Sequence, residues 1–325
     1  MDNNLNKQHR LLAVLAHPDD ETFGIGGTLA LYAQMGVEVF LLCATRGEAG
    51  DMLPELLEGF GSIAERRESE LRCAAKVLGI KEVYFLDYRD SGMPGSNDNF
   101  HERALAMAPV VEVAGKVVTL IRTIRPQVVI TNDPIGGYKH PDHIAIHNAT
   151  VKAFHLASNS EFQDGSLPFQ PQKLYFHTLP KGILRKAVRL LKFLGKDPHH
   201  FGRNADIDLA AIVEEGDFPI HAQIDYRKVT RLREAAAACH TSQLGSGPPQ
   251  HGIVSLIWRF FGGKDQYMRG YPEAEEGLRE RDLFEGVELE EDQFKKPLEN
   301  IHRERKAIHE KDSAVADIDL ENPIG

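Results

Sequence analysis

The stretch LLAVLAHPDDETFGIGG, residues 11–27, decides the fold. Its apolar run at residues 11–16 ends abruptly at HPDDE, residues 17–21, and an amphipathic segment that contains three glycines follows. A short apolar run bounded by a turn signal indicates a buried strand of a parallel sheet. Such a strand delivers one imidazole and three carboxylates to the C-terminal edge of the sheet, where open α/β folds bind their ligands.

The acidic cluster at residues 17–21 has two interpretations when it is taken alone. Three acids beside a histidine are costly to hold together unless a cation lies among them. Alternatively, the cluster is a solvated helix start, because Asp20 or Thr22 could cap the helix that follows. Glu21 either supports a metal site or is a first-turn helix carboxylate.

Composition and charge narrow the class of protein. The 325 residues are 42% hydrophobic and 26% charged, which is typical of a globular protein with one large α/β domain or two domains. The formal net charge of −10 argues against nucleic acid as a partner, because phosphate binding needs a basic surface. The three cysteines, Cys43, Cys73 and Cys239, are widely spaced, which indicates neither a disulfide framework nor a metal-binding CxxC motif. With a polar start and no targeting segment, this pattern predicts a cytoplasmic protein.

Strand-like and helix-like segments alternate through the first half, which predicts a Rossmann-like, doubly wound, mostly parallel α/β sheet. The expected strands are residues 11–16, 37–45, 83–86, 128–131, 173–178 and 208–213, and the expected helices are residues 23–35, 63–78, 110–124, 144–157, 183–194 and 226–240. We expect one domain over residues 8–285, with a core at 8–160, an irregular part at 161–285 that completes the pocket, and a charged, loosely held tail at 286–325.

A second polar motif, His140-Pro141-Asp142-His143, follows the fourth expected strand. In the strand order 3-2-1-4-5 the first and fourth strands are neighbours, so both motifs face one crevice. A catalytic zinc takes three N or O ligands from the protein and keeps one position open. His17, Asp20 and His143 supply such a set, which leaves Asp19 and His140 for acid–base work.

The paired motifs resemble the PIG-L/LmbE-like family of zinc-dependent N-deacetylases. The likeness covers roughly residues 11–243 and extends to segments 45–50, 67–71, 90–93, 132–143 and 240–243. Within the family, the elements Arg-Asp-Ser-Gly-Met and Gly-Gly-Tyr-x-His-Pro-Asp-His are most similar to the branch that deacetylates N-acetylglucosaminyl-inositol. The resemblance implies zinc-dependent hydrolysis of an N-acetyl group on a glucosamine-type sugar, by attack of a metal-bound water.

The resemblance also implies roles for individual residues. His17, Asp20 and His143 match the ligands of one zinc per chain, with iron(II) as the alternative ion in the cell. Asp19 matches the general base, and His140 matches the group that stabilises the oxyanion, as an imidazolium hydrogen-bonded to a carboxylate. Tyr138 matches a residue that can swing toward the carbonyl oxygen. The expected substrate-binding residues are Arg67, Asp90, Glu48 and His240, the last of which could equally pair with a helix C-terminus.

Two rival functions remain open at this stage. One is an amidase for a larger thiol or sugar conjugate, and the other is a non-catalytic sugar- or nucleotide-binding protein on the same fold. The expected partner is a small N-acetylated sugar. The sequence does not decide whether the chain forms a homo-oligomer. The basic amphipathic segment at residues 181–196 is expected to pack on its own domain or to cover the site, with a membrane surface as the minor alternative.

Overall fold

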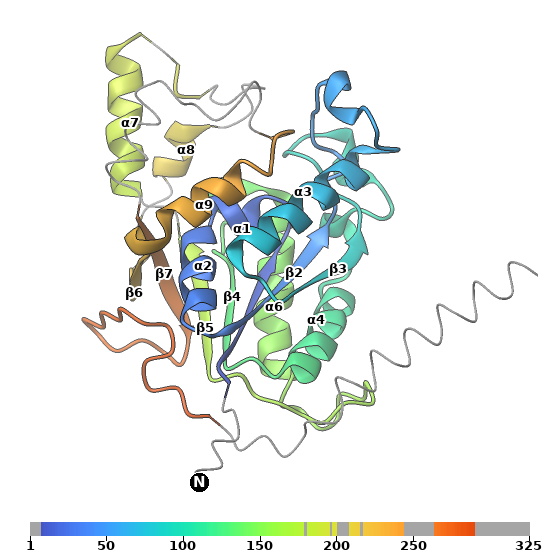
Figure 1. Cartoon of the computed structure of the whole chain (residues 1–325), viewed down its shortest axis with the longest axis vertical. Helices are drawn as coiled ribbons and strands as arrows, with labels where there is room; N and C mark the ends of the chain where they lie inside the picture. Colours follow the sequence, from blue (N-terminus) through green and yellow to red (C-terminus); the bar gives the residue numbers. More distant parts are fainter. Residues whose placement is uncertain are drawn as a thin grey trace, which may run out of the picture. The chain divides into compact units, whose positions relative to one another are not determined.

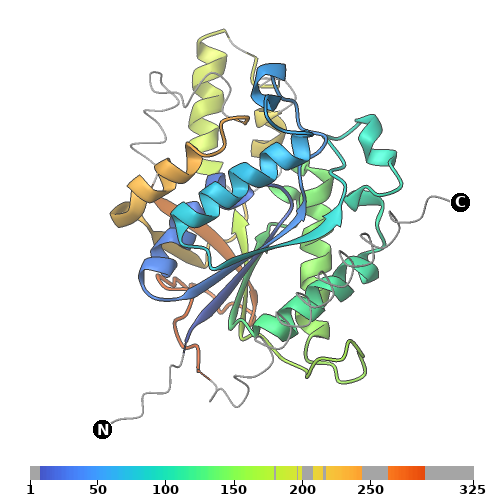
Figure 2. The same ribbon diagram turned by 45° about the vertical axis from the view of Figure 1, so that its right-hand side comes forward.

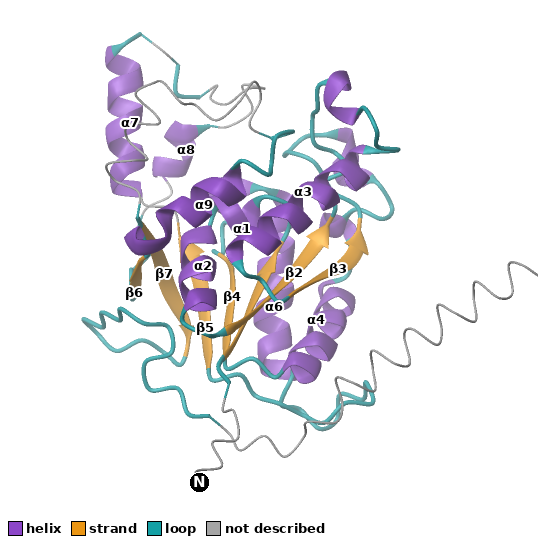
Figure 3. Ribbon diagram, in the orientation of Figure 1, coloured by secondary structure: helices purple, strands orange, loops and turns teal. Residues whose placement is uncertain are grey.

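The computed structural model describes residues 8–178, 181–195, 197–199, 208–214, 217–243 and 263–289. Within these residues, the strands form one sheet in the order β3-β2-β1-β4-β5-β7-β6 (Figures 1 and 3). The strands are β1 (Arg10–Leu15), β2 (Glu38–Thr45), β3 (Glu82–Tyr88), β4 (Val128–Asn132), β5 (Lys173–Thr178), β6 (Ala222–Asp225) and β7 (Lys264–Tyr271). Strands β1 to β5 are parallel, as predicted, and β7 runs antiparallel to both β5 and β6.

Helices cover both faces of this sheet (Figures 1 and 2). They are α1 (Asp20–Phe23), α2 (Gly26–Gln34), α3 (Ile63–Leu78), α4 (Val110–Ile124), α5 (Gly136–Lys139), α6 (Pro141–Leu156), α7 (Lys181–Phe193), α8 (Leu209–Glu214) and α9 (Thr230–Ala237). Short 3₁₀ turns lie at Pro54–Leu57, Asn97–Phe100, Leu105–Met107 and Arg227–Val229.

The central strand β1 sends successive side chains into two separate cores. Leu11 and Ala13 pack with residues of α2, α3 and α9, whereas Leu12 and Val14 pack with residues of α4 and α6. This alternation follows from the two-residue period of a strand. Because all four side chains are fully buried, β1 holds the residues that follow it in a fixed position.

Several elements differ from the sequence-based expectation, among them the helix expected at 226–240, which is a 3₁₀ turn at Arg227–Val229 followed by α9. The helix expected at 23–35 is present as α2, and a separate short helix, α1, precedes it; a Cβ on Gly24 between them would lie 2.7 Å from the Asp20 carbonyl oxygen. Helix α6 begins at Pro141, three residues earlier than expected, because the fixed φ of proline suits the first helical position. The strand expected at 208–213 is wrong: helix α8 lies there, and Asp208 caps it by accepting the N–H of Ala211.

The interpretation of the cysteines also needs correction. Cys73 on α3 and Cys239 after α9 form a disulfide across 166 residues, while Cys43 is a free, buried thiol. Spacing along the sequence could not indicate this pair, because the two cysteines approach only when α9 packs against α3. The argument from the cysteines for a reducing compartment therefore no longer holds.

The expected helix at 183–194 is present as α7, which begins two residues earlier. It packs on its own domain, as expected: Val188 lies in a small apolar cluster with Leu209 and Ile212 of α8, and Tyr138 packs against this cluster. None of the helices in the described residues is long and apolar enough to cross a membrane. The tail from residue 290 and the apolar segment around Trp258 lie outside the described residues.

Candidate active site

The predicted site residues come together at the carboxyl edge of the parallel strands. His17 lies two residues after β1 and Asp90 two residues after β3, while His140 and His143 follow β4 through the short helix α5. Glu48 follows β2. Parallel strands β3, β2, β1 and β4 are neighbours in the sheet, so their carboxyl ends bring these loops to one place.

Three donor atoms of the predicted metal ligands lie at distances that suit one ion. The His17 Nδ1 and His143 Nε2 atoms are 3.2 Å apart. The Asp20 Oδ2 atom lies 3.7 Å from His17 Nδ1 and 3.3 Å from His143 Nε2. Ligands about 2.0–2.1 Å from a tetrahedral ion would lie roughly 3.3 Å from one another, so the three atoms fit such a site.

Asp142 supports this group from behind, a role that the sequence did not reveal. Its carboxylate lies 3.1 Å from Nε2 of His17, which leaves Nδ1 of the same ring for a metal ion. Asp142 is itself fixed by the backbone N–H and hydroxyl of Ser91. A carboxylate on the far nitrogen of a ligating histidine is a recurrent device of metal sites, and the position of Asp142 between His140 and His143 was its only sequence signal.

Two other groups of donors lie close enough to hold an ion. One is His17 with His140 and His143, and the other is His17 with Asp90 and Asp142. In the first set His140 could bind only through Nε2, because its Nδ1 accepts the backbone N–H of Asp142 at 3.2 Å; the set with Asp20 remains the expected one. Asp142 in turn makes hydrogen bonds to Ser91 and His17 and so has fewer free lone pairs.

The site gathers more negative than positive charge. Although burial opposes the ionisation of Asp20 and of Asp90, neighbouring histidines hold the pKa of both carboxyls well below the usual range. Burial lowers the pKa of His17, but Asp90, Asp142 and Asp20 outweigh it and raise that pKa above its usual value. A buried site with this charge attracts a cation.

Asp19 combines an unusual backbone with a raised pKa. Its φ of 120° is rare for a residue with a side chain, and its Oδ2 accepts a hydrogen bond from Arg67 at 3.1 Å. Burial raises the pKa of Asp19 to about 6, with Arg67 opposing and Asp20 adding to the shift. A carboxylate with a pKa near 6 is suited to taking up a proton near neutral pH.

The surroundings of His140 favour a neutral imidazole over the imidazolium that the resemblance implies. Burial, together with the charges of His17 and His143, lowers the pKa of His140 to about 2. Because its Nδ1 accepts the N–H of Asp142, the hydrogen of the neutral ring lies on Nε2, which can donate. The ring of Tyr138 packs edge-on against both His140 and His143, with centroids 5.8 and 5.2 Å apart.

The expected substrate-binding residues divide into two groups. Glu48 and Asp90 lie together in the loops after β2 and β3, where Glu48 Oε2 accepts the Asp90 N–H at 3.0 Å. Arg67 is 4% exposed and donates to Gly47 O, Pro18 O and Asp19. His240 is fully buried, and its Nε2 lies 2.7 Å from Glu21 rather than among the donors around His17.

This arrangement is that of a hydrolytic enzyme on a Rossmann-like sheet whose buried imidazoles and carboxylates can hold a metal ion. The family described as "PIG-L: GlcNAc-PI de-N-acetylase" matches residues 12–154. A relative from Kineococcus radiotolerans, a 1D-myo-inositol 2-acetamido-2-deoxy-alpha-D-glucopyranoside deacetylase, is 36% identical over 87% of this chain and 84% of its own. The chain belongs to the PIG-L family, and it is an amide hydrolase of the N-deacetylase class.

Solved structures agree with the fold. A conserved protein from Thermus thermophilus superimposes with a TM-score of 0.54 at 23% identity, over 82% of this chain and 96% of its own. The N,N'-diacetylchitobiose deacetylase from Pyrococcus horikoshii gives a TM-score of 0.55 at 21% identity, over 80% of this chain and 83% of its own. At these identities the likeness establishes the fold and not the substrate.

Proposed function

We propose that this enzyme removes the N-acetyl group from an N-acetylglucosaminyl-inositol and that it does so with one zinc ion per chain. The relative from Kineococcus radiotolerans carries that activity in its name and matches most of this chain. The observation that carries the proposal is the group formed by His17, Asp20 and His143, whose donor atoms lie 3.2–3.7 Å apart beside Asp19.

Zinc suits the donor set better than a hard cation does. Two imidazoles and one carboxylate are a ligand set found in zinc hydrolases, whereas magnesium and calcium prefer oxygen ligands alone. Iron(II) accepts the same ligands and remains the alternative ion. When bound, such a metal polarises the acyl carbonyl and makes water a stronger acid.

Asp19 is the general base of the proposed reaction. With a pKa near 6 it is mostly ionised at neutral pH and can take a proton from the attacking water. It then returns this proton to the nitrogen of the sugar as the amide C–N bond breaks, so the products are acetate and a free amine. Arg67 supports the ionised form through its 3.1 Å contact with the carboxylate.

His140 stabilises the oxygen that becomes negative during the attack. Its Nε2–H is the available donor, because Nδ1 is engaged by the backbone. Tyr138 lies against the same ring and is the second candidate donor to this oxygen. Glu48 and Asp90 are proposed to bind sugar hydroxyls, since both carboxylates lie in the loops that border the site.

The proposal is tested by metal analysis together with amine release from N-acetylglucosaminyl-inositol. We expect about one zinc per chain in the wild type and little in His143→Ala. Asp19→Ala should keep its zinc and lose roughly 10²- to 10⁴-fold in kcat, the range expected for a general base. A metal-free wild type, or full turnover by Asp19→Ala, would contradict the assigned roles. Cleavage of a larger thiol conjugate but not of the N-acetyl sugar would favour the amidase alternative.

A further inference from the structure

The backbone of Asp19 is held in its rare conformation by one neighbouring side chain. The Oε2 atom of Glu21 accepts the backbone N–H of Asp19 at 2.8 Å. Glu21 is fully buried. A φ of 120° is strained for a residue with a side chain and persists only where the surroundings determine it. The Glu21 carboxylate is therefore a candidate for the group that holds this conformation.

The other oxygen of Glu21 is held from the far end of the chain. Its Oε1 atom lies 2.7 Å from Nε2 of His240, 219 residues away, and also accepts the hydroxyl of Thr22. Since a carboxylate can only accept, Nε2 carries the hydrogen and His240 is the donor. The attraction of Glu21 also raises the pKa of His240, against the effect of burial.

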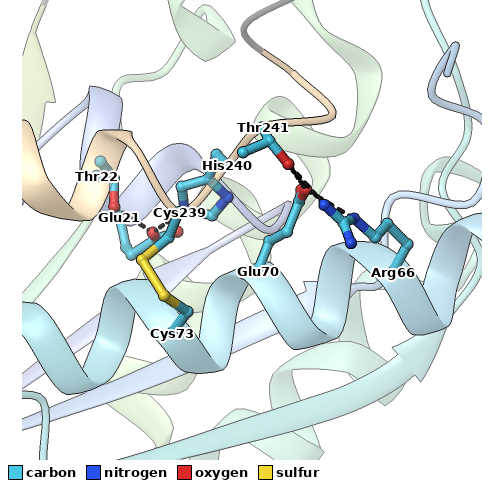
Figure 4. Close-up of a disulfide and its surroundings, with 8 residues drawn as sticks. All are labelled: Glu21, Thr22, Arg66, Glu70, Cys73, Cys239, His240 and Thr241. Carbon is cyan, nitrogen blue, oxygen red and sulfur yellow. Dashed lines mark hydrogen bonds and ion pairs between the residues drawn. A yellow bond between two sulfur atoms is a disulfide. The ribbon is translucent and has the colours of Figure 1, made fainter. Parts of the chain in front are cut away.

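One face of helix α3 holds the segment that contains His240. Arg67, Glu70 and Cys73 follow one another at three-residue intervals and so share a face of the helix. Arg67 contacts Asp19, and Cys73 forms the disulfide with Cys239, the residue directly before His240. Figure 4 shows the disulfide on one side of His240 and Glu70 on the other.

Glu70 anchors the residues that follow His240. Its carboxylate accepts the N–H and hydroxyl of Ser242 at 2.9 and 2.6 Å and the hydroxyl of Thr241 at 2.8 Å. The segment that carries His240 is thus held on both sides of this residue, and its imidazole contacts Glu21 beside α3 (Figure 4).

We propose that Glu21 and His240 are positioning residues for the base: His240 orients the Glu21 carboxylate, and this carboxylate holds the Asp19 backbone so that its side chain faces the reacting centre. This inference rests on the proposed function of Asp19. It replaces direct substrate binding as the role of His240, because that side chain is fully buried and its Nε2 is directed at Glu21.

A matched pair of substitutions tests the donor atom. The amide nitrogen of glutamine can occupy the place of Nε2 in a histidine, whereas that of asparagine corresponds to Nδ1. We expect His240→Gln to keep kcat within about threefold of the wild type. His240→Asn should lose roughly 10- to 100-fold in kcat at an unchanged KM and with a full zinc content, as for other groups that orient catalytic residues. Equal kcat for His240→Asn and the wild type would overturn the proposal.

Two further variants separate positioning from simple support of the fold. Tyr32→Phe removes the hydrogen bonds of the Tyr32 hydroxyl with Asp282 and the Leu283 N–H, away from Glu21, Glu70 and His240, so it should lower the melting temperature and leave kcat within about twofold. In an Asp19→Ala background, His240→Asn should cause no further loss, because His240 acts through Asp19. An additional tenfold loss there would show that His240 acts by another route. Full activity of Asp19→Ala alone would instead disprove the proposed function.

Discussion

At the scale of single residues, Asp265 is a buried acid outside the catalytic group. Its Oδ2 accepts the N–H and the hydroxyl of Thr28 at 2.9 and 2.7 Å, and burial raises its pKa to about 6. The folded protein therefore binds more protons than the unfolded chain between about pH 4 and 6, and Asp265 makes stability fall as pH rises through this window. Above about pH 6 the ionised Asp265 lowers the free energy of unfolding by roughly 3 kcal/mol, because a tenfold change in proton affinity is about 1.4 kcal/mol.

Asp265→Asn should remove this dependence, because an amide oxygen can accept the same two hydrogen bonds without ionising. We expect the unfolding free energy of the variant, relative to the wild type, to rise between pH 4 and pH 7 in urea titrations. Asp225→Asn, at an exposed carboxylate that pairs with Arg227, is the control and should leave the wild-type profile in place. An identical pH profile for Asp265→Asn and the wild type would disprove the assignment.

At the residue scale, the sequence was most informative where polar side chains are concentrated in short motifs. HPDDE and HPDH contain most of the site, and the structure brings His17, Asp20 and His143 together as the sequence led us to expect. The sequence could not show the pairing of His240 with Glu21, because no local pattern links residues 219 positions apart. Nor could the sequence give the lowered pKa of His140, which depends on burial and on two neighbouring imidazoles.

At the scale of elements, the disulfide ties α9 to α3 behind the site. The cross-link spans 166 residues and so restricts the unfolded chain strongly. We expect the Cys73→Ala/Cys239→Ala double variant to lose about 2–5 kcal/mol of unfolding free energy. It should also become insensitive to dithiothreitol, whereas reduction should lower the melting temperature of the wild type.

The free thiol provides the control for this measurement. Cys43→Ala leaves the cross-link intact, so its melting temperature should still fall when dithiothreitol is added. A wild type whose melting temperature does not respond to reductant would contradict the predicted contribution. The fraction of cross-linked chain in freshly lysed cells would also test the predicted cytoplasmic location, since a reducing cytosol opposes a lasting disulfide.

Element prediction failed where the sequence pattern was short or mixed. Residues 208–213 contain β-branched Ile212 and Val213, which favour a strand, yet the cap by Asp208 and the contact with α7 make a helix there. Strand β7, KDQYMRGY, alternates too weakly in hydrophobicity to be recognised. It is a strand because it pairs with both β5 and β6.

At the scale of the described part of the molecule, the C-terminal strands complete the parallel sheet and tie it to helix α2. The Tyr267 hydroxyl donates to Thr28 at 2.8 Å, and Tyr32 donates to Asp282 at 2.8 Å. Lys173 on β5 forms a buried ion pair with Glu280. The less regular second half thus fixes α2, which packs on one face of the sheet, and β5, the strand next to β4.

Because these strands are held so firmly, metal binding should stabilise the whole fold and not the loops alone. The four acids Asp19, Asp20, Asp90 and Asp142 are crowded at one edge of the sheet, and an ion that binds only the folded chain shifts the folding equilibrium. At a free zinc concentration 100 times its Kd, the gain is about 2.7 kcal/mol, which for a chain of this size raises the melting temperature by roughly 4–5 °C.

We therefore expect the melting temperature to fall on chelation, to recover on addition of zinc and to be unaffected by zinc in His143→Ala. His199→Ala, which removes an exposed histidine paired with Asp208, is the matched control and should respond to zinc as the wild type does. If zinc shifts His143→Ala as much as the wild type, the ion binds at another site, and the geometry around His17 then has a purpose other than holding a metal.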